Sequence, residues 1–412
     1  MVTDSTRVVK PAEARNDRAM ASAGHPHTWR QEWPLALLAL SLAFVFGAPG
    51  VAASLVGTNA GLIAWLLVLC GVLFAAAIAI VRHADELARR LGEPRGTLLL
   101  TLAITGLEVA MVGFVMSSGE PKPTLARDTM FAVVMLVFNL FLGVAMLLGG
   151  LKHREQPYSL QGAISFLSLI VPLNVLCLVL PNFTRSTPGP TLSTFQMVFL
   201  SLTSLGIYAV FLMVQIRRHR DFFIETPSAA EPGLDHSPAH SSSGVDEDHW
   251  PDQRLAANTS GRPTWLHAAM LAIYGVPLVL LSKKLALPID TAVERLDAPV
   301  ALGGMILAVL VLSPESIAAV RAAYDNRLQR SVNILLGSVL ASTCLTIPLV
   351  IAISLITGRE LIFGLEPAQM VLLALTLVSA ILTFSMPRTN LLLGCVHLLL
   401  FGAYFVLLFD GA

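Results

Sequence analysis

Two glutamates, Glu108 and Glu315, stand inside apolar stretches where a charged side chain is costly. Glu108 follows an uncharged run that begins at Thr97, and Glu315 follows an apolar run over residues 300–312. A carboxylate in the hydrocarbon of a membrane costs about 2.5–3.5 kcal/mol on insertion scales, so such residues usually have a function. The pair therefore predicts a site for ions and protons.

Ion exchange is the chemistry that two such carboxyl groups can perform together. Removal from water favours the protonated form of a carboxyl group, and a cation in the same cavity favours the ionised form. One divalent cation could thus replace two protons. The structural alternative is a protonated glutamate that bonds a backbone carbonyl, and it applies more readily to Glu315 because Arg321 and Asp325 follow it.

Two carboxylates cannot complete the coordination of a cation, since calcium takes about six to eight oxygen ligands. The predicted supporting ligands are Asn139, Asn333, Ser338, Ser342, Thr105 and Ser313. Gly106, Pro314 and Gly337 are predicted to break their helices and to free backbone carbonyls at the same depth. The alternative for each polar side chain is a hydrogen bond between helices, which is common in membranes.

The surrounding chain has the composition of a membrane protein. Of its 412 residues, 55% are apolar and only 13% are charged, about half the usual charged fraction. The charges separate about eleven apolar runs of the length that crosses a bilayer as a helix. We predict an all-α polytopic membrane protein with spans near 34–53, 60–81, 97–117, 128–150, 160–180, 193–216, 264–283, 298–320, 331–357, 367–387 and 389–409.

The two glutamates also indicate an internal repeat. Glu108 lies in the third predicted span and Glu315 in the eighth, and each is followed by a turn and a Leu-x-Arg segment. An offset of five spans reverses the orientation of the second copy, which is typical of secondary transporters built from inverted repeats. The predicted organisation is an N-terminal arm (1–33), an extra N-terminal helix (34–53), a first five-helix repeat (60–216), a polar linker (217–262) and a second five-helix repeat (263–412).

Orientation follows from the distribution of basic residues. About three quarters of the 27 Lys and Arg residues fall on the side of the N-terminus when the spans alternate. Because cytoplasmic loops carry the excess of Lys and Arg, we predict that the arm and the linker are cytoplasmic. An odd number of spans then places the C-terminus on the periplasmic side.

Four motifs resemble the ChaA-type calcium/sodium:proton antiporters of the calcium:cation antiporter superfamily. They are TLARDTMFA (124–132), NILLGSVLAS (333–342), TIPLV (346–350) and HRDFF (219–223). The resemblance covers nearly all of spans 3 to 11 and implies that Glu108 and Glu315 are the ion and proton sites, with Gly337-Ser338 as the Gly-Ser pair after the second acid. One departure is that Thr105 and Gly106 precede Glu108, where the superfamily often has Gly-Asn.

The resulting prediction is a secondary antiporter in a bacterial inner membrane that exports calcium, sodium or potassium in exchange for protons. The alternative is a cation channel or passive uniporter that uses the same acidic pair. No GxSxG or HExxH motif occurs in or beside the spans, so an enzyme is not expected. We expect no cofactor, because the cation is cargo, and no nucleic-acid partner, because the net charge is zero. The partners are cations, protons and lipid, and a homo-oligomer is left open.

Overall fold

The computed structural model describes residues 32–91, 95–116, 122–218, 222–223, 263–296, 299 and 301–410, and nearly all of them are helical. Most of the predicted arm and most of the predicted linker lie outside the described residues. The first half contains α2 (Trp33–Gly47), α3 (Pro49–Leu55), α4 (Asn59–Leu91), α5 (Arg95–Met116), α6 (Leu125–Val134), η3 (Met135–Phe141), α7 (Leu142–His153), β1 (Gln156–Pro157), α8 (Leu160–Leu178), η4 (Leu180–Phe183), α9 (Thr194–Met213) and η5 (Val214–Arg218). The second half contains α11 (Thr264–Leu296), α12 (Ala301–Tyr324), α13 (Leu328–Thr357), α14 (Pro367–Thr383), β2 (Arg388–Thr389) and α15 (Leu391–Asp410).

These helices confirm the all-α polytopic class. Within the described ranges, eight helices are long and apolar enough to cross a membrane, and three shorter apolar helices occupy the other predicted spans. A helix satisfies all of its backbone hydrogen bonds internally, which is why apolar segments of this length adopt it in a bilayer. The number of crossings and the inverted order of the two repeats stay predictions.

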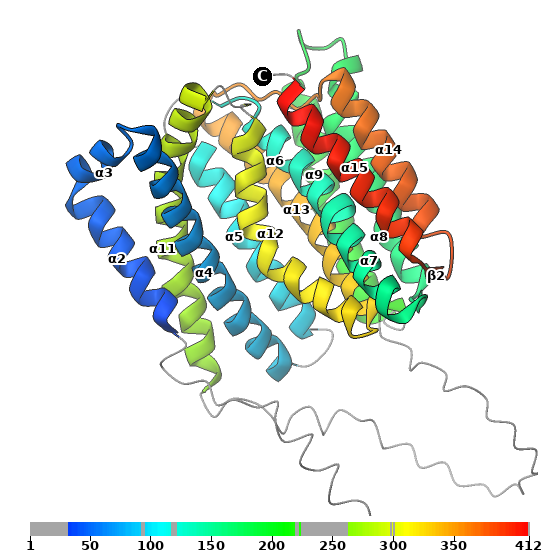
Figure 1. The fold of residues 1–412 in the computed structure, drawn as a ribbon. Helices are drawn as coiled ribbons and strands as arrows, with labels where there is room; N and C mark the ends of the chain where they lie inside the picture. Colours follow the sequence, from blue (N-terminus) through cyan, green and yellow to red (C-terminus); the bar gives the residue numbers. More distant parts are fainter. Residues whose placement is uncertain are drawn as a thin grey trace, which may run out of the picture.

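The helices form two groups that pack against each other (Figure 1). α2 and α3 lie at one edge, beside α4 and α11, which are each 33 residues long and pack against each other. α13 contacts α5, α8, α9 and α12 in the centre, and α15 packs against α7 and α14 at the opposite edge. α2 and α11 both begin at the lower side in Figure 1, whereas α15 ends at the upper side.

Glycine allows the closest of these helix contacts. A Cβ atom at Gly394 of α15 would lie 2.7 Å from the backbone nitrogen of Leu147 and 2.9 Å from the carbonyl oxygen of Gly143, both on α7. Small residues at such positions let membrane helices approach closely. The short strands β1 and β2 pair antiparallel at the end of this helix pair, with Gln156 opposite Thr389.

The predicted helix breaks are wrong. Gly106, Pro314 and Gly337 lie inside the continuous helices α5, α12 and α13. A glycine costs a helix only about 1 kcal/mol relative to alanine, and packing against neighbouring helices compensates for the single donor that Pro314 lacks. Irregular helical backbone occurs at other positions, including the π-helical turn η3, which joins α6 to α7.

The boundary of the predicted linker also needs correction. Arg217 and Arg218 belong to η5, so helical structure continues past residue 216. Phe223 packs against the bundle, with its ring centroid 5.5 Å from that of Phe166 in α8 and 5.8 Å from that of Phe211 in α9. The linker prediction missed this contact because it read residues 217–262 as uniformly polar.

Candidate functional site

Adjacent turns of α13 bind the two glutamates. The hydroxyl of Ser342 donates a hydrogen bond of 2.6 Å to Oε1 of Glu108, and the hydroxyl of Ser338 donates one to Oε1 of Glu315. Glu108 is only 3% exposed and Glu315 only 7%. Four residues rise about 6 Å along a helix, so the two carboxyl groups meet one face of α13 a single turn apart.

The local sequence explains this placement. Side chains four residues apart lie on the same face of a helix, so Ser338 and Ser342 point the same way while Val339, Leu340 and Ala341 fill the packed core. α5 and α12 both pack against α13 and carry one glutamate each. α5 and the consecutive helices α12 and α13, which lie far from α5 in the sequence, therefore bring the two acids together.

The charge of neither glutamate is balanced by a basic side chain. In the described part of the chain, no Lys, Arg or His forms an ion pair with Glu108 or Glu315. An ionised carboxylate in an apolar interior needs a partner charge. Since the hydroxyl groups of Ser338 and Ser342 are neutral, a proton or a bound cation must supply that charge.

Two further hydroxyl groups were missed by the sequence analysis, one next to Glu315 in sequence and one on α13. Ser316 follows Glu315, and Thr346 stands one turn beyond Ser342 on α13. Both side chains are buried, and their oxygen atoms have no hydrogen-bond partner among the described residues. The spacing of Ser338, Ser342 and Thr346 was the available signal. A buried hydroxyl without a protein partner is a candidate neutral oxygen ligand.

The two asparagines do not contact the glutamates. The amide nitrogen of Asn139 in η3 donates to Thr376 of α14 over 2.9 Å, and its oxygen lies 3.4 Å from Nδ1 of His397 in α15. These are hydrogen bonds between helices, which were the alternative to a ligand role for Asn139. The amide of Asn139 is therefore committed to joining η3, α14 and α15.

Asn333 is likewise engaged elsewhere. Its amide nitrogen donates to the carbonyl oxygen of Phe223 over 2.6 Å, and its oxygen accepts a bond of 2.9 Å from Gln329. The structure therefore does not match the prediction that Asn139 and Asn333 lie beside the acids.

The remaining predicted ligands have local roles. Ser313 donates to the carbonyl oxygen of Val309 on its own helix. Thr105 is buried on α5, one turn before Glu108. No group of three or more His, Cys, Asp or Glu side chains within the described ranges could hold a metal ion. A cation bound here would depend on two glutamates and on neutral oxygens.

Comparison with known proteins identifies relatives along most of the chain. The model of the family described as sodium/calcium exchanger protein matches residues 61–217 and 266–409. The chain is 41% identical over 343 residues to the putative ionic transporter y4hA of Sinorhizobium fredii, covering 83% of this chain and 88% of the relative. It is 35% identical over 373 residues to the sodium-potassium/proton antiporter ChaA of Escherichia coli, covering 90% and 94%.

The fold is also found among solved structures. The crystal structure of an H+/Ca2+ exchanger named CAX superposes with a TM-score of 0.62, covering 92% of this chain and 89% of that chain. Its sequence identity is 15%, so this likeness concerns the fold alone.

Proposed function

Because the chain belongs to the sodium/calcium exchanger protein family, we propose that it is a secondary active antiporter that exchanges a cation for protons across a bacterial inner membrane. The observation that carries this function is the pair of buried glutamates without a basic partner. Each carboxyl group must hold a proton or share a cation, and the two states exclude each other at the same oxygen atoms.

The exchange cycle follows from charge balance. With both glutamates protonated the site is neutral, and a divalent cation restores neutrality after two protons leave. A monovalent cation balances one lost proton. The hydroxyl groups of Ser338 and Ser342 donate to the ionised carboxylates, and charge-assisted bonds of this kind are the strong ones. We assign their oxygen lone pairs, with those of Ser316 and Thr346, as neutral ligands of the cation.

We propose calcium, sodium or potassium as the exported cation. The family description and the name of the E. coli relative, which is a sodium-potassium/proton antiporter, support all three. Without Asn139 and Asn333, the proposed ligands are the carboxylate oxygens of the two glutamates and the hydroxyl oxygens of Ser338, Ser342, Ser316 and Thr346, and calcium takes about six to eight oxygen ligands. Water or backbone carbonyls would complete the coordination wherever these side chains do not reach the cation.

We also propose that the chain consists of two inverted repeats, 60–216 and 263–412, with the N-terminus and the linker in the cytoplasm and the C-terminus in the periplasm. The excess of Lys and Arg on one side supports this orientation. The start of α2 and the end of α15 on opposite sides of the bundle in Figure 1 agree with an odd number of crossings.

Proton movement in everted membrane vesicles tests the function. The vesicles are acidified by respiration, and calcium, sodium and potassium salts are added separately while a fluorescent dye reports the internal pH. We expect at least one cation to drive protons out of the vesicles, and vesicles without the protein to show no such response. Cation flux without proton movement would favour the channel or uniporter and refute the antiporter.

A further inference from the structure

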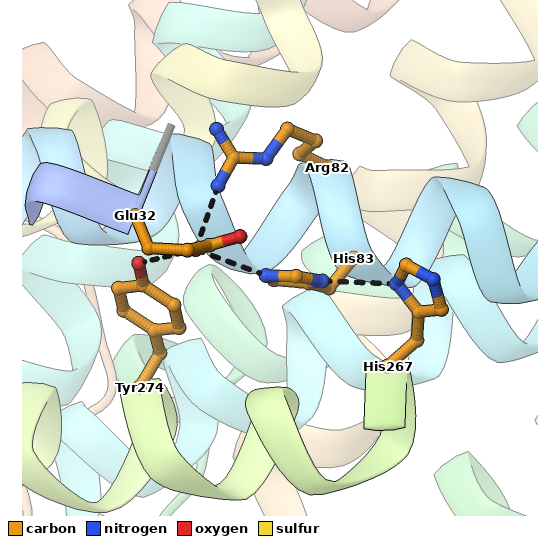
Figure 2. Close-up of polar contacts among 5 residues, drawn as sticks. All are labelled: Glu32, Arg82, His83, His267 and Tyr274. Atoms are coloured by element: carbon orange, nitrogen blue, oxygen red, sulfur yellow. Dashed lines mark hydrogen bonds and ion pairs between the residues drawn. The ribbon is translucent and has the colours of Figure 1, made fainter. Parts of the chain in front are cut away.

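A second buried polar cluster lies far from the two glutamates in sequence, where α2 begins (Figure 2). Glu32 immediately precedes α2, His83 lies on α4, and His267 and Tyr274 lie on α11. All four are buried, and His83 and His267 are 1% and 0% exposed. The cluster therefore joins the extra N-terminal helix to both of the long helices.

Glu32 is the anionic centre of this cluster. Its Oε2 accepts a hydrogen bond of 2.7 Å from the Tyr274 hydroxyl and one of 3.0 Å from Nη2 of Arg82, and it lies 3.4 Å from Nε2 of His83. Burial raises the pKa of Glu32, but the Tyr274 hydrogen bond and the charges of Arg82 and His83 outweigh it and hold the pKa below its usual value. Glu32 is thus a carboxylate that faces an imidazole.

The two imidazoles share one hydrogen. Nδ1 of His83 and Nδ1 of His267 are 3.0 Å apart (Figure 2), so one nitrogen must donate and the other must accept. The carboxylate of Glu32 can only accept, which favours a proton on Nε2 of His83 and leaves Nδ1 of His83 as the acceptor for His267. One added proton turns the pair into an imidazole–imidazolium contact, which is a stronger, charge-assisted hydrogen bond.

The charged residues nearest to the histidine pair in sequence lie on α4. On α4, Asp85, Glu86 and Arg90 follow His83, and Arg90 bonds both Glu86 and Thr264 of α11. The other helices packed against α4 are α5, which carries Glu108, and α12, which carries Glu315 and Arg321.

An apolar cleft of about 450 Å³ lies between α4, α5 and α11. It is lined by Ile80 of α4 and by Gly106 and Leu107 of α5, which directly precede Glu108. The lining residues of α11 are Leu271, Ala272, Gly275, Val276, Val279 and Leu280. Ile80 is one turn from His83, and Leu271 is one turn from His267. The two helices that the histidine pair joins therefore also line a cleft beside the residues that precede Glu108.

We propose that Glu32, His83 and His267 form a proton-binding site, separate from the exchange site, through which acid tightens the contact between α4 and α11 and slows exchange. The ligand is a proton from the side of the membrane on which α2 begins. Histidine suits this role because its charge changes between about pH 5 and 8. The proposal relies on the proposed antiport only for its transport readout.

The test compares pH profiles of exchange in everted vesicles at saturating cation, with the external pH varied over about 5 to 8 and the internal pH fixed. The variants His83→Gln and His267→Gln keep a hydrogen-bonding side chain but cannot bind the proton. We expect both to retain their fast alkaline rate at acid pH. Glu32→Gln should move the acid inhibition to lower pH by about one unit or more, because the opposite charge that favours imidazolium is lost.

His153→Gln is the matched control, since His153 bonds the carbonyl oxygen of Tyr324 over 2.8 Å at the end of α7, and it should leave the profile unchanged. A direct readout is the distance between spin labels at the exposed residues Ile78 of α4 and Ile273 of α11, in a chain whose native cysteines are replaced. We expect the distribution of this distance to narrow at acid pH in the unaltered protein, and to be independent of pH in both histidine variants.

An unchanged acid inhibition in both histidine variants, at normal membrane abundance, would overturn this inference. Spin-label distances that do not change with pH would also overturn it. If the unaltered protein moves no protons with any cation at any pH, the proposed function fails instead, and the spin-label experiment still decides whether the histidine pair binds a proton.

Discussion

Replacing Glu315 with glutamine tests whether Glu315 takes part in ion exchange or only stabilises the structure. Glutamine keeps the shape of the side chain and an oxygen that can accept from Ser338, so the fold should lose no more than about 0.5–1.5 kcal/mol, the net contribution of one hydrogen bond. It cannot ionise. Removing one partner of a buried charge pair typically costs about 3–5 kcal/mol, and each 1.4 kcal/mol is about tenfold in affinity.

Glu315→Gln should therefore weaken apparent cation affinity by roughly 100-fold to several thousand-fold, which abolishes exchange at millimolar cation. The assay is cation-dependent proton movement in everted vesicles, with membrane abundance measured by immunoblot. Asp325→Asn is the matched control, because it removes the same charge at an exposed position just after the same helix, where water screens it. Normal exchange by Glu315→Gln at normal abundance would refute the reasoning and make Glu315 structural.

Three further predictions test the site, the packing and the topology. Ser342→Ala removes a donor to a buried carboxylate and should weaken apparent cation affinity at fixed pH by about 10- to 100-fold, whereas Ser204→Ala, whose hydroxyl bonds its own helix, should not. Gly394→Val should lower the melting temperature of the purified protein because its Cβ collides with α7, while Gly402→Val, with no atom within 4 Å, should not. A protease added to intact spheroplasts should spare residues 217–262, and cleavage there would reverse the topology.

The sequence was sufficient to predict the helical class and the two buried acids, because both predictions rest on the free-energy cost of placing charge in hydrocarbon. That cost is the same whatever the tertiary packing, so Glu108 and Glu315 are visible without a structure. Ser338 and Ser342 were also identifiable, since a four-residue spacing fixes which side chains of one helix share a face.

The predicted placement of the two asparagines beside the acids does not match the structure. Asn139 is held by Thr376 and His397, and Asn333 by the carbonyl oxygen of Phe223. An amide bonds whichever polar group the fold brings near it, and hydropathy does not report that choice. The cluster at Glu32 escaped for the same reason, because its residues come from three separate segments.

The burial and charge of the two acids also explain how proton and cation movement can stay coupled even if the helices do not close the site completely. Neither Glu108 nor Glu315 has a basic partner among the described residues, so the state with both carboxylates ionised and no cation bound is the costly one. The site can change sides cheaply only when protons or a cation have neutralised it. A leak would have to pass through the costly empty state, which argues against a channel that uses the same pair. The coupling of protons to cations thus depends on the charge of the site. The surrounding helices need only keep other cations from neutralising the two glutamates.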